Sequence, residues 1–388
     1  MGKIKDVAVQ VRGVSYKPND LHDTLNENSI MLLRANNISD DRINYDDVVF
    51  VDKTKVSKSQ YLQVGDILIC ASSGSKNLVG KSASIKGSIN ATFGAFCKVV
   101  RPSDINANYL SHFFTSPKYR ETISKLSAGA NINNIRNEDI DNLDIVIPPI
   151  ETQCKIAATL DKVTNLIDTC NAILEKLDLL VKSRFVEMFG EPILNPKGWD
   201  MATIGDIVTE VRYGTSRPAI DGGKYPYLRM NNLTYDGHLD LTDLKRIDIP
   251  DNEIDKCIVR KGDVLFNRTN SVELVGKTCV FDESEDMVIA GYIIRVRLKP
   301  VMLPIVLSCF MNTDALKKKL RNMAKGAVNQ ANINAQELQA IDIYLPPLDL
   351  QKQFAAFVEQ TDKSKLAVKK VLEKAETHKK ALMQEYFG

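Results

Sequence analysis

The sequence is poor in several features on which enzymes and exported proteins depend. Its 388 residues include four histidines and seven cysteines, and no two cysteines form a C-x-x-C pair. An odd number of scattered cysteines suits reduced, buried thiols better than a disulfide framework or a zinc site. The longest apolar run, Val301–Met311, is about half the roughly 20 residues that a membrane span needs. Residues 1–10 also lack a signal-peptide core. We therefore expect a cytoplasmic protein with no membrane segment.

Charge of one sign is not in excess either. Lysine and arginine number 51 against 49 aspartate and glutamate, a net charge of +2, and 44% of the residues are apolar. This composition is typical of a globular protein with two or three domains and excludes histone-like polycations and disordered chains. Any polyanion would have to be bound by local patches of positive charge.

Catalytic motifs are missing as well. The sequence has no Walker A, G-x-G-x-x-G, G-x-S-x-G or H-E-x-x-H pattern. It also lacks the Asn-Pro-Pro-aromatic motif of amino methyltransferases and the Glu-x-Lys of many magnesium nucleases. A lone histidine is usually structural, so His22, His112, His238 and His378 are not assigned to a site. We predict no catalytic residue, no metal site and no cofactor site in this chain.

The chain does contain an internal repeat, which must be recognised before the fold is interpreted. Four short segments of the first half recur in the same order in the second half. The matched pairs are Leu33–Asn37 with Leu228–Asn232, Gly65–Leu68 with Gly262–Leu265, Leu78–Lys81 with Leu274–Lys277, and Asp144–Pro149 with Asp342–Pro347. Both copies also end alike, in Met188–Gly190 and Tyr386–Gly388. The chain is therefore expected to be two copies of one module.

Each module begins with a globular part, residues 1–147 and 191–345, of mixed α/β character. Short runs rich in β-formers are separated by turn residues, and two helical stretches interrupt them. The β-rich runs are 47–51, 67–70, 264–266 and 292–298, and the helical stretches are Asn108–Leu126 and Ile305–Met323.

Each module ends with a long helix after a Pro-Pro pair, at 148–190 and 346–388. In the first helix, apolar residues alternate at spacings of four and three, which is typical of a coiled-coil seam. The seam positions are Ile156, Leu160, Val163, Ile167, Cys170, Leu174, Leu177, Val181, Arg184 and Met188. The matching positions of the second helix are Phe354, Val358, Thr361, Lys365, Val368, Leu372, Ala375, Lys379, Leu382 and Tyr386, where polar residues dilute the pattern.

Connectivity predicts how the helices pair. The first helix leads from one globular part into the other, whereas the second leaves the second globular part. If the modules are related by a pseudo-twofold axis, the helices run antiparallel, over about 60 Å for 40 residues. The expected fold class is α+β, with two similar mixed α/β domains separated by a long antiparallel two-helix coiled coil.

Polar residues that suit nucleic-acid binding gather at matching places in both copies. Arginine and asparagine make bidentate contacts with guanine and adenine edges, and lysine contacts phosphates. In the first copy these residues are Arg12, Ser15, Tyr16, Lys17, Arg34, Asn36, Asn37, Ser73, Ser75, Lys76, Asn77, Lys81, Asn131, Asn133 and Arg136. In the second copy they are Arg212, Tyr213, Thr215, Ser216, Arg217, Arg229, Asn231, Asn232, Asn267, Arg268, Thr269, Asn270, Lys277, Asn329, Gln330 and Asn332.

An alternative for each cluster is that serine, glycine and asparagine simply form turns. Lys81 and Lys277 occupy the same repeated motif and therefore suit either a shared phosphate contact or a structural role. The loop Asn267–Ser271 differs from its counterpart in the first copy, although the flanking motifs are repeated. Different loops in one framework are what two different DNA half-sites would require.

Together, the two G-D-I/V-L and L-V-G-K motifs, the late N-x-N segments and the Pro-Pro pairs before long helices resemble the specificity subunits of Type I restriction-modification systems. The resemblance covers essentially the whole chain. It implies that 1–147 and 191–345 are target recognition domains, which read the two halves of a bipartite double-stranded DNA target. The helices 148–190 and 346–388 would then set the spacer and dock partner subunits.

The resemblance further implies a non-catalytic chain. Its expected partners are two adenine-specific DNA methyltransferase subunits and two restriction subunits, which would carry S-adenosylmethionine, ATP and Mg²⁺. Two other hypotheses remain open on the residues alone. One is a coiled-coil adaptor that binds only protein, and the other is a DNA methyltransferase or nuclease with an unrecognised active site.

Overall fold

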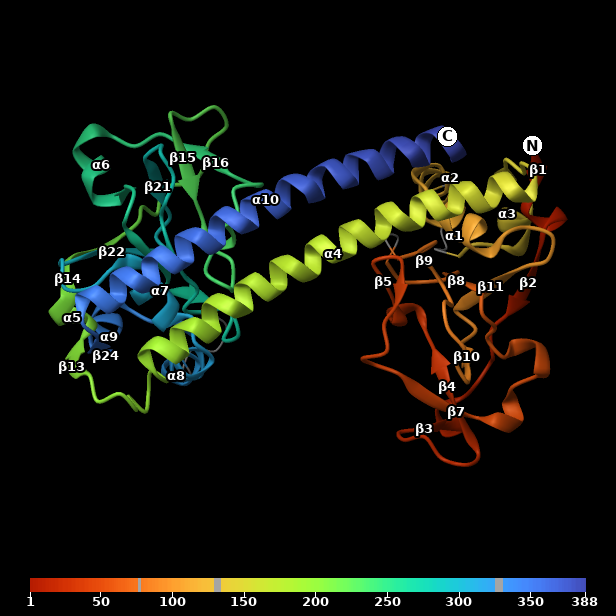
Figure 1. The fold of residues 1–388 in the computed structure, drawn as a ribbon, viewed down its shortest axis with the longest axis horizontal. Helices are drawn as coiled ribbons and strands as arrows, with labels where there is room; N and C mark the ends of the chain where they lie inside the picture. Colours follow the sequence, from red (N-terminus) through yellow and green to blue (C-terminus); the bar gives the residue numbers. More distant parts are fainter. Residues whose placement is uncertain (76–77, 129–133, 325–330) are drawn as a thin grey trace. The chain divides into compact units, whose positions relative to one another are not determined.

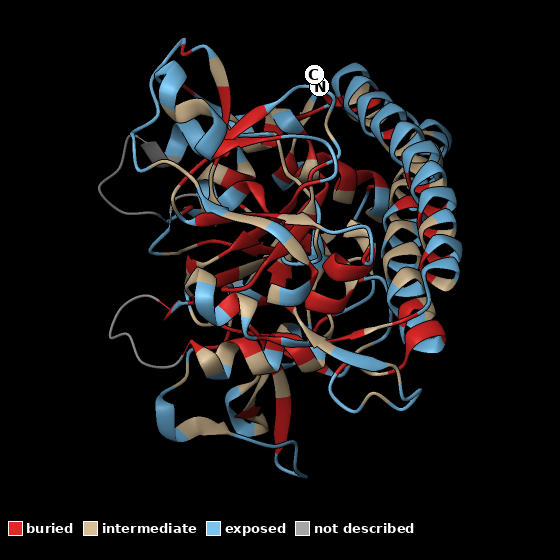
Figure 2. Ribbon diagram, turned by 90° about the vertical axis from the view of Figure 1, so that its left-hand side faces the viewer, coloured by how far each residue is buried: buried red, intermediate tan, exposed pale blue. Residues whose placement is uncertain are grey.

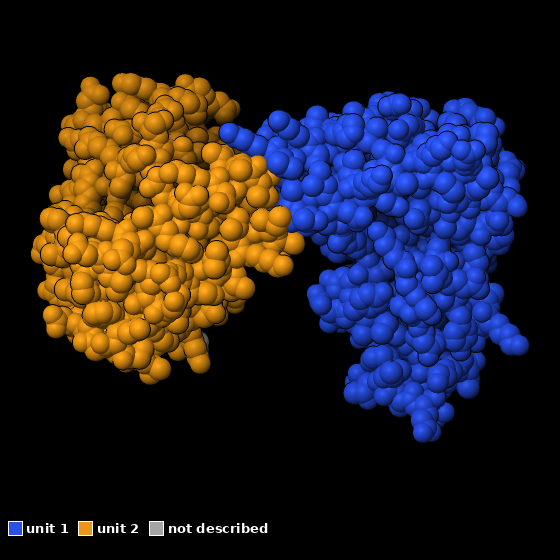
Figure 3. All heavy atoms as spheres, viewed as in Figure 1, with its two compact units in different colours: residues 1–171, 369–388 blue, residues 172–368 orange. Residues whose placement is uncertain are grey.

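The structure is a computed structural model that describes residues 1–75, 78–128, 134–324 and 331–388. The chain forms two compact units (Figure 3). Unit 1 comprises Met1–Asn171 and Lys369–Gly388, and unit 2 comprises Ala172–Val368. Each unit thus contains one globular part and a portion of both long helices.

The main sheet of unit 1 is antiparallel, in the order β2-β11-β8-β9. These strands are Ala8–Arg12, Cys97–Pro102, Ile67–Cys70 and Ser82–Ser84. Strand β8 is buried on both faces, which explains its uninterrupted apolar sequence. Ile67 and Ile69 pack against helices α1 (Ala107–Thr115) and α2 (Pro117–Ala128), whereas Leu68 and Cys70 pack on the opposite face.

A second sheet covers that opposite face, in the order β10-β4-β7-β3. Its strands are Ala91–Phe93, Ser29–Leu33, Val49–Asp52 and Leu21–His22, and β10 runs parallel to β4. Leu33 and Phe93 bring the second sheet into the same core as Leu68. Unit 1 is therefore layered as helices, main sheet and second sheet.

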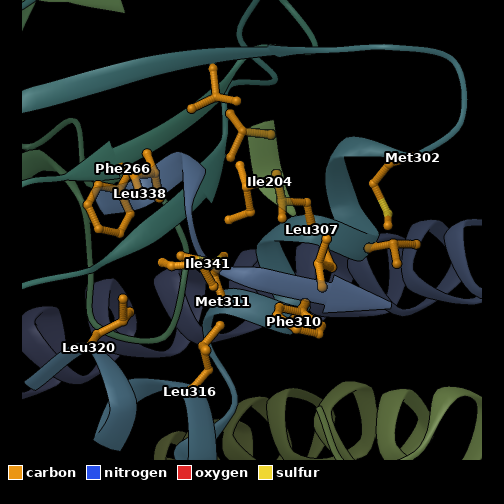
Figure 4. Packing of buried hydrophobic residues seen from close by; sticks show 14 of the residues in the cluster. Ile204, Phe266, Met302, Leu307, Phe310, Met311, Leu316, Leu320, Leu338 and Ile341 are labelled. Atoms are coloured by element: carbon orange, nitrogen blue, oxygen red, sulfur yellow. The ribbon is translucent and has the colours of Figure 1, made fainter. Parts of the chain in front are cut away.

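Unit 2 repeats this layering with strands β14-β22-β18-β20 in the main sheet. They are Val208–Tyr213, Ile293–Leu298, Val264–Asn267 and Thr278–Val280. Phe266 packs with Phe310 of α7 (Pro304–Met311) and Leu320 of α8 (Asp314–Met323), and Figure 4 shows these side chains pointing into one core. Leu265 points to the other face, into a separate cluster.

The second sheet of unit 2 has the order β16-β15-β21-β17. Its strands are Lys245–Ile247, Tyr225–Leu228, Met287–Ile289 and Ile258–Val259. As in unit 1, the sheet contains one parallel pair, which is the central pair β15 with β21 here and the edge pair β10 with β4 in unit 1. The edge strand is placed differently, because β3 lies beside β7 in unit 1 and β17 lies beside β21 in unit 2.

Short elements complete the two units. A two-stranded ribbon joins the start of each globular part to the segment before Pro-Pro, β1 with β12 and β13 with β24. The ribbon strands are Gly2–Lys3, Asp144–Ile145, Asp200–Thr203 and Asp342–Leu345. The remaining named elements are β5 (Ile38–Ser39), β6 (Arg42–Ile43), β19 (Thr269–Asn270), β23 (Ala331–Asn332), α3 (Asn137–Asp141), α5 (Ile204–Ile207), α6 (Asp251–Cys257) and α9 (Ala335–Gln339).

The four predicted β-rich runs are strands, but each predicted helical stretch is two helices. The first breaks at Ser116, which has an extended backbone because it precedes Pro117. The second breaks at Thr313, an extended N-cap between α7 and α8. The pre-proline rule could have identified the first break, whereas no comparable signal marks the second.

The long helices are α4 (Ile150–Phe189) and α10 (Leu348–Phe387), each of 40 residues (Figure 1). Every predicted seam position on both helices is buried or half-buried, so the heptad interpretation is confirmed. In unit 1, Ile156 of α4 shares a core with Leu382 of α10. In unit 2, Phe189 of α4 packs against Phe354 of α10, with ring centroids 5.3 Å apart. The beginning of each helix thus lies beside the end of the other, and the predicted antiparallel pairing is confirmed.

Two of the polar seam residues have charged partners on the long helices. Lys365, which is 8% exposed, places its Nζ 2.6 Å from a carboxylate oxygen of Asp178 on α4. Arg184 pairs with Glu187 at 2.8 Å, and its guanidinium lies over the ring of Phe357. Figure 2 shows the resulting distribution, with buried residues on the strands and exposed residues along much of both long helices. None of the described helices is long and apolar enough to span a bilayer.

Candidate nucleic-acid interface

The repeated G-D-I/V-L motif builds a turn with a buried ion pair. Gly65 and Gly262 adopt φ values of 90° and 93°, which favour glycine. The following Asp66 is 1% exposed and accepts two hydrogen bonds of 2.7 Å from Arg101. In unit 2, Asp263 receives Arg297 at 2.9 and 3.4 Å. The two arginines, which the sequence analysis missed, occupy matching places in β11 and β22.

The repeated L-V-G-K motif returns the chain to the end of the same strand. The N–H groups of Gly80 and Gly276 donate to the carbonyls of Cys70 and Asn267 at 2.8 and 2.9 Å. A Cβ on Gly80 would lie 2.5 Å from Ile123, and one on Gly276 would lie 2.6 Å from Leu320. The glycine is therefore required where the loop crosses helix α2 or α8. In each unit the two motifs thus hold the ends of one loop.

Three of the predicted clusters of unit 1 meet at a pocket of about 270 Å³. Tyr16, Arg34, Asn36 and Ser73 all line it, although they come from separate segments. The complete lining is Tyr16, Arg34, Ala35, Asn36, Ser72, Ser73, Gly74, Gly94, Phe96 and Cys97. Ser72 also pairs with Asn134, next to the fourth predicted cluster. Segments that are far apart in the sequence therefore line one pocket in unit 1.

The two asparagines of each R-x-N-N segment differ in burial, and the exposed Asn36 donates to an Asp47 carboxylate oxygen at 2.6 Å. Asn37 accepts from the Arg34 backbone N–H at 2.8 Å and donates to the Asn44 carbonyl at 3.0 Å. Asn232 repeats this with Arg229 and Asp240, at 2.9 and 2.8 Å. Both are buried, so the structure assigns them to loop geometry. The preceding residues, Asn36 and Asn231, are exposed.

The two arginines of these segments are held by acids. Arg34 Nη2 lies 3.0 Å from Asp47, and Arg229 Nη2 lies 2.7 Å from Asp243. Each guanidinium is only partly exposed. Each arginine directly follows a strand, and its acid lies just before the strand that pairs with that one. The pairing fixes the guanidinium in one orientation, as bidentate base recognition requires.

In unit 2, Arg268 is held in place by an aromatic side chain. Its guanidinium carbon lies 4.8 Å from the centre of the Tyr213 ring, and its Nη1 donates to the Gly291 carbonyl at 3.5 Å. Strand β19, which follows directly, pairs with β23, and Thr269 Oγ1 donates to Asn332 Oδ1 at 2.8 Å. Four predicted residues from three segments are therefore brought together.

Asn267 and Lys277 face inward in the same unit. The Asn267 amide donates to the carbonyls of Thr269 and Tyr292, both at 3.1 Å, and accepts from Asn270 at 2.8 Å. Lys277 is 6% exposed and donates to the Met230 carbonyl at 2.6 Å. Burial lowers the pKa of Lys277. For Lys277 the geometry favours the structural role that the sequence left open, whereas Lys81 is half-buried.

Several other predicted residues lie at the surface. Arg217 makes a two-point pair with Glu253, at 2.7 and 3.1 Å, and Arg212 lies 3.1 Å from Glu210. Thr215 is partly buried, and its hydroxyl accepts from the Arg217 N–H at 3.2 Å. The exposed remainder is Arg12, Ser15, Lys17, Ser75, Arg136 and Ser216. Lys76, Asn77, Asn131, Asn133, Asn329 and Gln330 lie outside the described residues. The DNA contacts of all these residues stay predictions.

Two of the four histidines have acidic partners. His112 Nε2 lies 2.8 Å from Asp161 of α4, and burial lowers the pKa of His112 although Asp161 opposes the shift. His238 lies 3.3 Å from Asp178, and with Asp236 these form one group with ligand atoms within 4.8 Å of one another. Lys365 already neutralises Asp178 at 2.6 Å, so this group is better explained as an ion-pair cluster than as a cation site.

A matched glutamine joins each long helix to its globular part. Gln153 accepts from the Asn106 N–H and donates to the Pro148 carbonyl, both at 2.8 Å. Gln351 accepts from Leu303 N–H at 2.9 Å and donates to Pro346 and Val301 at 2.9 and 3.0 Å. These residues, 2% and 0% exposed, were also missed, although both stand five residues after the first proline of the repeated Pro-Pro pair.

The structure thus contains two copies of one mixed α/β domain. Each copy holds a polar loop between two repeated motifs and packs on an antiparallel helix pair, which is the architecture of a DNA-specificity protein. A family model described as the Type I restriction modification DNA specificity domain matches residues 2–179 and 196–377. The chain belongs to this family.

Curated relatives agree with the assignment. The EcoKI specificity subunit of Escherichia coli (strain K12) is 33% identical over 375 residues, covering 92% of this chain and 80% of that protein. The StySPI specificity subunit of Salmonella potsdam is 31% identical over 373 residues, with the same shares covered. The chain is thus a non-catalytic DNA-recognition subunit of a Type I restriction-modification system.

Solved structures show the same fold. A Type I S subunit from M. genitalium matches with a TM-score of 0.58 and 13% identity, covering 100% of this chain and 95% of that one. A chain from a study of the assembly and conformational transition of a type I R-M system matches with a TM-score of 0.55 and 18% identity, covering 99% and 96%. The predicted family, fold class and general function are confirmed by these comparisons.

Proposed function

We propose that unit 1 and unit 2 each read one half of a bipartite double-stranded DNA target through the loop held between their repeated motifs. The observation that carries this proposal is that the two units share the residues around the loop but differ in the residues of the loop itself. The Asp66–Arg101 pair is repeated by Asp263–Arg297, yet Ala71 occupies the loop position that Arg268 occupies in unit 2. This equivalence follows from their N–H groups, which donate at 2.9 Å to Phe96 and Tyr292 respectively.

We further propose that the long helices dock two DNA methyltransferase subunits and that two restriction subunits complete the complex. Helix α4 supports this with Leu166, Ile173 and Leu180, which stand seven residues apart and are 45%, 38% and 47% exposed. An apolar row outside the seam is typical of a second helix-packing face. In this proposal S-adenosylmethionine, ATP and Mg²⁺ bind to those partner subunits, which agrees with the absence of their motifs from this sequence.

The complex acts in the cytoplasm in this proposal, where its DNA substrate is located. The seven cysteines support a reducing compartment, since none is in a disulfide and only Cys154 is exposed.

Mapping methylated adenines in a host that expresses this chain with its methyltransferase partner tests the proposal directly. Two short specified blocks separated by an unspecified spacer are expected. Exchanging residues 191–345 for those of a relative should change only one block, and a change in both would contradict modular reading. A protein-only adaptor is rejected by a sequence-selective mobility shift, and a free-standing methyltransferase by absence of S-adenosylmethionine binding to the purified chain.

A further inference from the structure

An exposed aromatic residue stands at the same turn in both units. Phe96 lies between β10 and β11 and is 67% exposed, and Tyr292 lies between β21 and β22 and is 49% exposed. Both turns are closed by the same hydrogen bond of 2.8 Å, from Cys97 to Gly94 and from Ile293 to Ala290. The repeat therefore preserves an aromatic ring at this position although the neighbouring turn residues differ.

The backbone of each aromatic residue is fixed by the loop that follows β8 in unit 1 or β18 in unit 2, the recognition loop of the proposed function. The Phe96 carbonyl accepts from the N–H groups of Ala71 and Ser72 at 2.9 and 3.0 Å. The Tyr292 carbonyl accepts from the Arg268 N–H at 2.9 Å and from the Asn267 amide at 3.1 Å. Each ring is consequently presented on a rigid support and would lose little conformational freedom on binding.

The surroundings of Phe96 are those of a DNA contact. Phe96 lines the pocket with Arg34, Asn36 and Ser73, which are suited to base edges and phosphates. Leaving so much of a phenylalanine ring in water forgoes the stabilisation that burial gives, at roughly 25 cal/mol per Å². A partner that covers the ring would recover that stabilisation.

We propose that Phe96 is a specificity-determining residue that packs against the 5-methyl group of a thymine in the half-site read by unit 1. The phenylalanine ring has no hydrogen-bonding group, and the thymine methyl is the apolar group that base pairs present in the major groove. Tyr292 occupies the same place for the other half-site, where its hydroxyl permits a polar contact as well. This inference rests on the proposed function.

Replacing thymine by deoxyuridine removes only that methyl group, so it provides a direct test. Binding of the complex with its methyltransferase subunits is measured on duplexes carrying the mapped target, with each thymine of the target replaced in turn. We expect one position at which the wild-type complex loses about fourfold in affinity, the equivalent of about 0.8 kcal/mol for one buried methyl group. The Phe96→Ala complex should bind thymine and deoxyuridine equally at that position.

Two further variants distinguish loss of the contact between Phe96 and thymine from a general loss of DNA binding. Tyr292→Ala should leave the deoxyuridine effect of the first half-site unchanged, and Phe96→Leu should retain part of it because leucine is also apolar. If Phe96→Ala does not fold, the wild-type and Phe96→Leu measurements still decide the question.

Three results would overturn the inference: no thymine in the half-site of unit 1, no wild-type response to any deoxyuridine, or an undiminished response in the Phe96 variants. In each case sequence-specific binding by the wild-type complex would persist. Loss of all sequence-specific binding by the wild-type complex would instead refute the proposed function, so the two failures are distinguishable.

Discussion

Arg101 donates two hydrogen bonds of 2.7 Å to the carboxylate of Asp66, which is almost completely buried. Asp263 and Arg297 repeat this pair in unit 2. Because the aspartate follows the glycine turn and the arginine lies on the adjacent strand, the pair joins two strands of the main sheet, at the end of β8 or β18 opposite the loop. The strands that carry each loop are therefore held together by residues outside the loop.

Asp66→Ala should destabilise unit 1 by about 3–5 kcal/mol, because it leaves a partly buried guanidinium without its partner. Urea unfolding measures this change. The matched control is Glu151→Ala, which removes an exposed partner of Lys155 and should change stability by less than about 1 kcal/mol. Equal effects of the two variants would show that the buried pair has no special structural role.

Gln351→Leu should destabilise the junction between α10 and its globular part by about 2–4 kcal/mol. The substitution leaves the buried Pro346 carbonyl without this partner, which costs about 1–3 kcal/mol, and adds smaller losses at the Leu303 N–H and the Val301 carbonyl, which are only partly buried. Gln360→Leu, at an exposed position of the same helix, is the control. The same loss in both variants, measured by denaturant unfolding, would reject the junction role.

Arg268→Ala should relax one position of one half-site and cost about 1–3 kcal/mol of discrimination. Lys277→Met should leave discrimination and salt dependence unchanged but lower stability, because Lys277 is buried on the Met230 carbonyl. Affinities for a set of single-base variants at two salt concentrations separate these effects. A uniform loss across all sequences for Arg268→Ala would make that residue a phosphate contact.

The buried Lys317 should make the stability of unit 2 depend on pH. Burial, with Lys277, Arg321 and Lys182 nearby, lowers its pKa from 10.5 to about 7, although Asp236 opposes the shift. The Lys317 amine therefore binds its proton more tightly in the unfolded chain than in the folded one. The loss of folding stability that this causes increases as pH falls from about 10 to 7 and is constant below pH 7.

Lys317→Met removes this loss of stability together with a hydrogen bond of 3.0 Å from Lys317 Nζ to the Gly276 carbonyl. Its effect on stability should therefore be more favourable at pH 7 than at pH 9.5, by about 1–3 kcal/mol. Denaturant unfolding at the two pH values measures the difference. Exposed Lys318→Met serves as the control. An effect of Lys317→Met that is the same at both pH values would contradict the role of its protonation.

Inserting four residues into α4 should lengthen the spacer of the DNA target. The added rise is about 6 Å, which approaches two base-pair steps. Mapping methylated sites before and after the insertion gives the spacer directly. An unchanged spacer with retained activity would show that α4 does not set it.

The sequence was sufficient for features that depend on local pattern. The heptad spacing that runs from Ile156 to Met188 predicted the seam of α4, and the matching GDIL and GDVL segments predicted two equivalent strands. The break at Ser116 was missed although Pro117 encodes it, because the apolar pattern continues through the bend.

Only part of the candidate site could be predicted from the local sequence pattern. Asn36 and Asn37 are neighbours of one type, yet one is exposed and the other is buried on the backbone. Asn267 is buried, whereas the adjoining Arg268 is partly exposed and lies over the Tyr213 ring. Which side chain faces outward depends on strand register and on the loops that pack behind it, which composition does not reveal.

The sequence by itself thus determined the duplication, the antiparallel helix pair and the family, because repeats, seven-residue periodicity and connectivity are properties of residue order. Only the tertiary structure decided that Lys277 is buried against the Met230 carbonyl and that Phe96 and Tyr292 stand exposed at equivalent turns. The physical reason is that burial and hydrogen-bond partners are set by segments far apart in the chain, such as the Met230 carbonyl that receives Lys277.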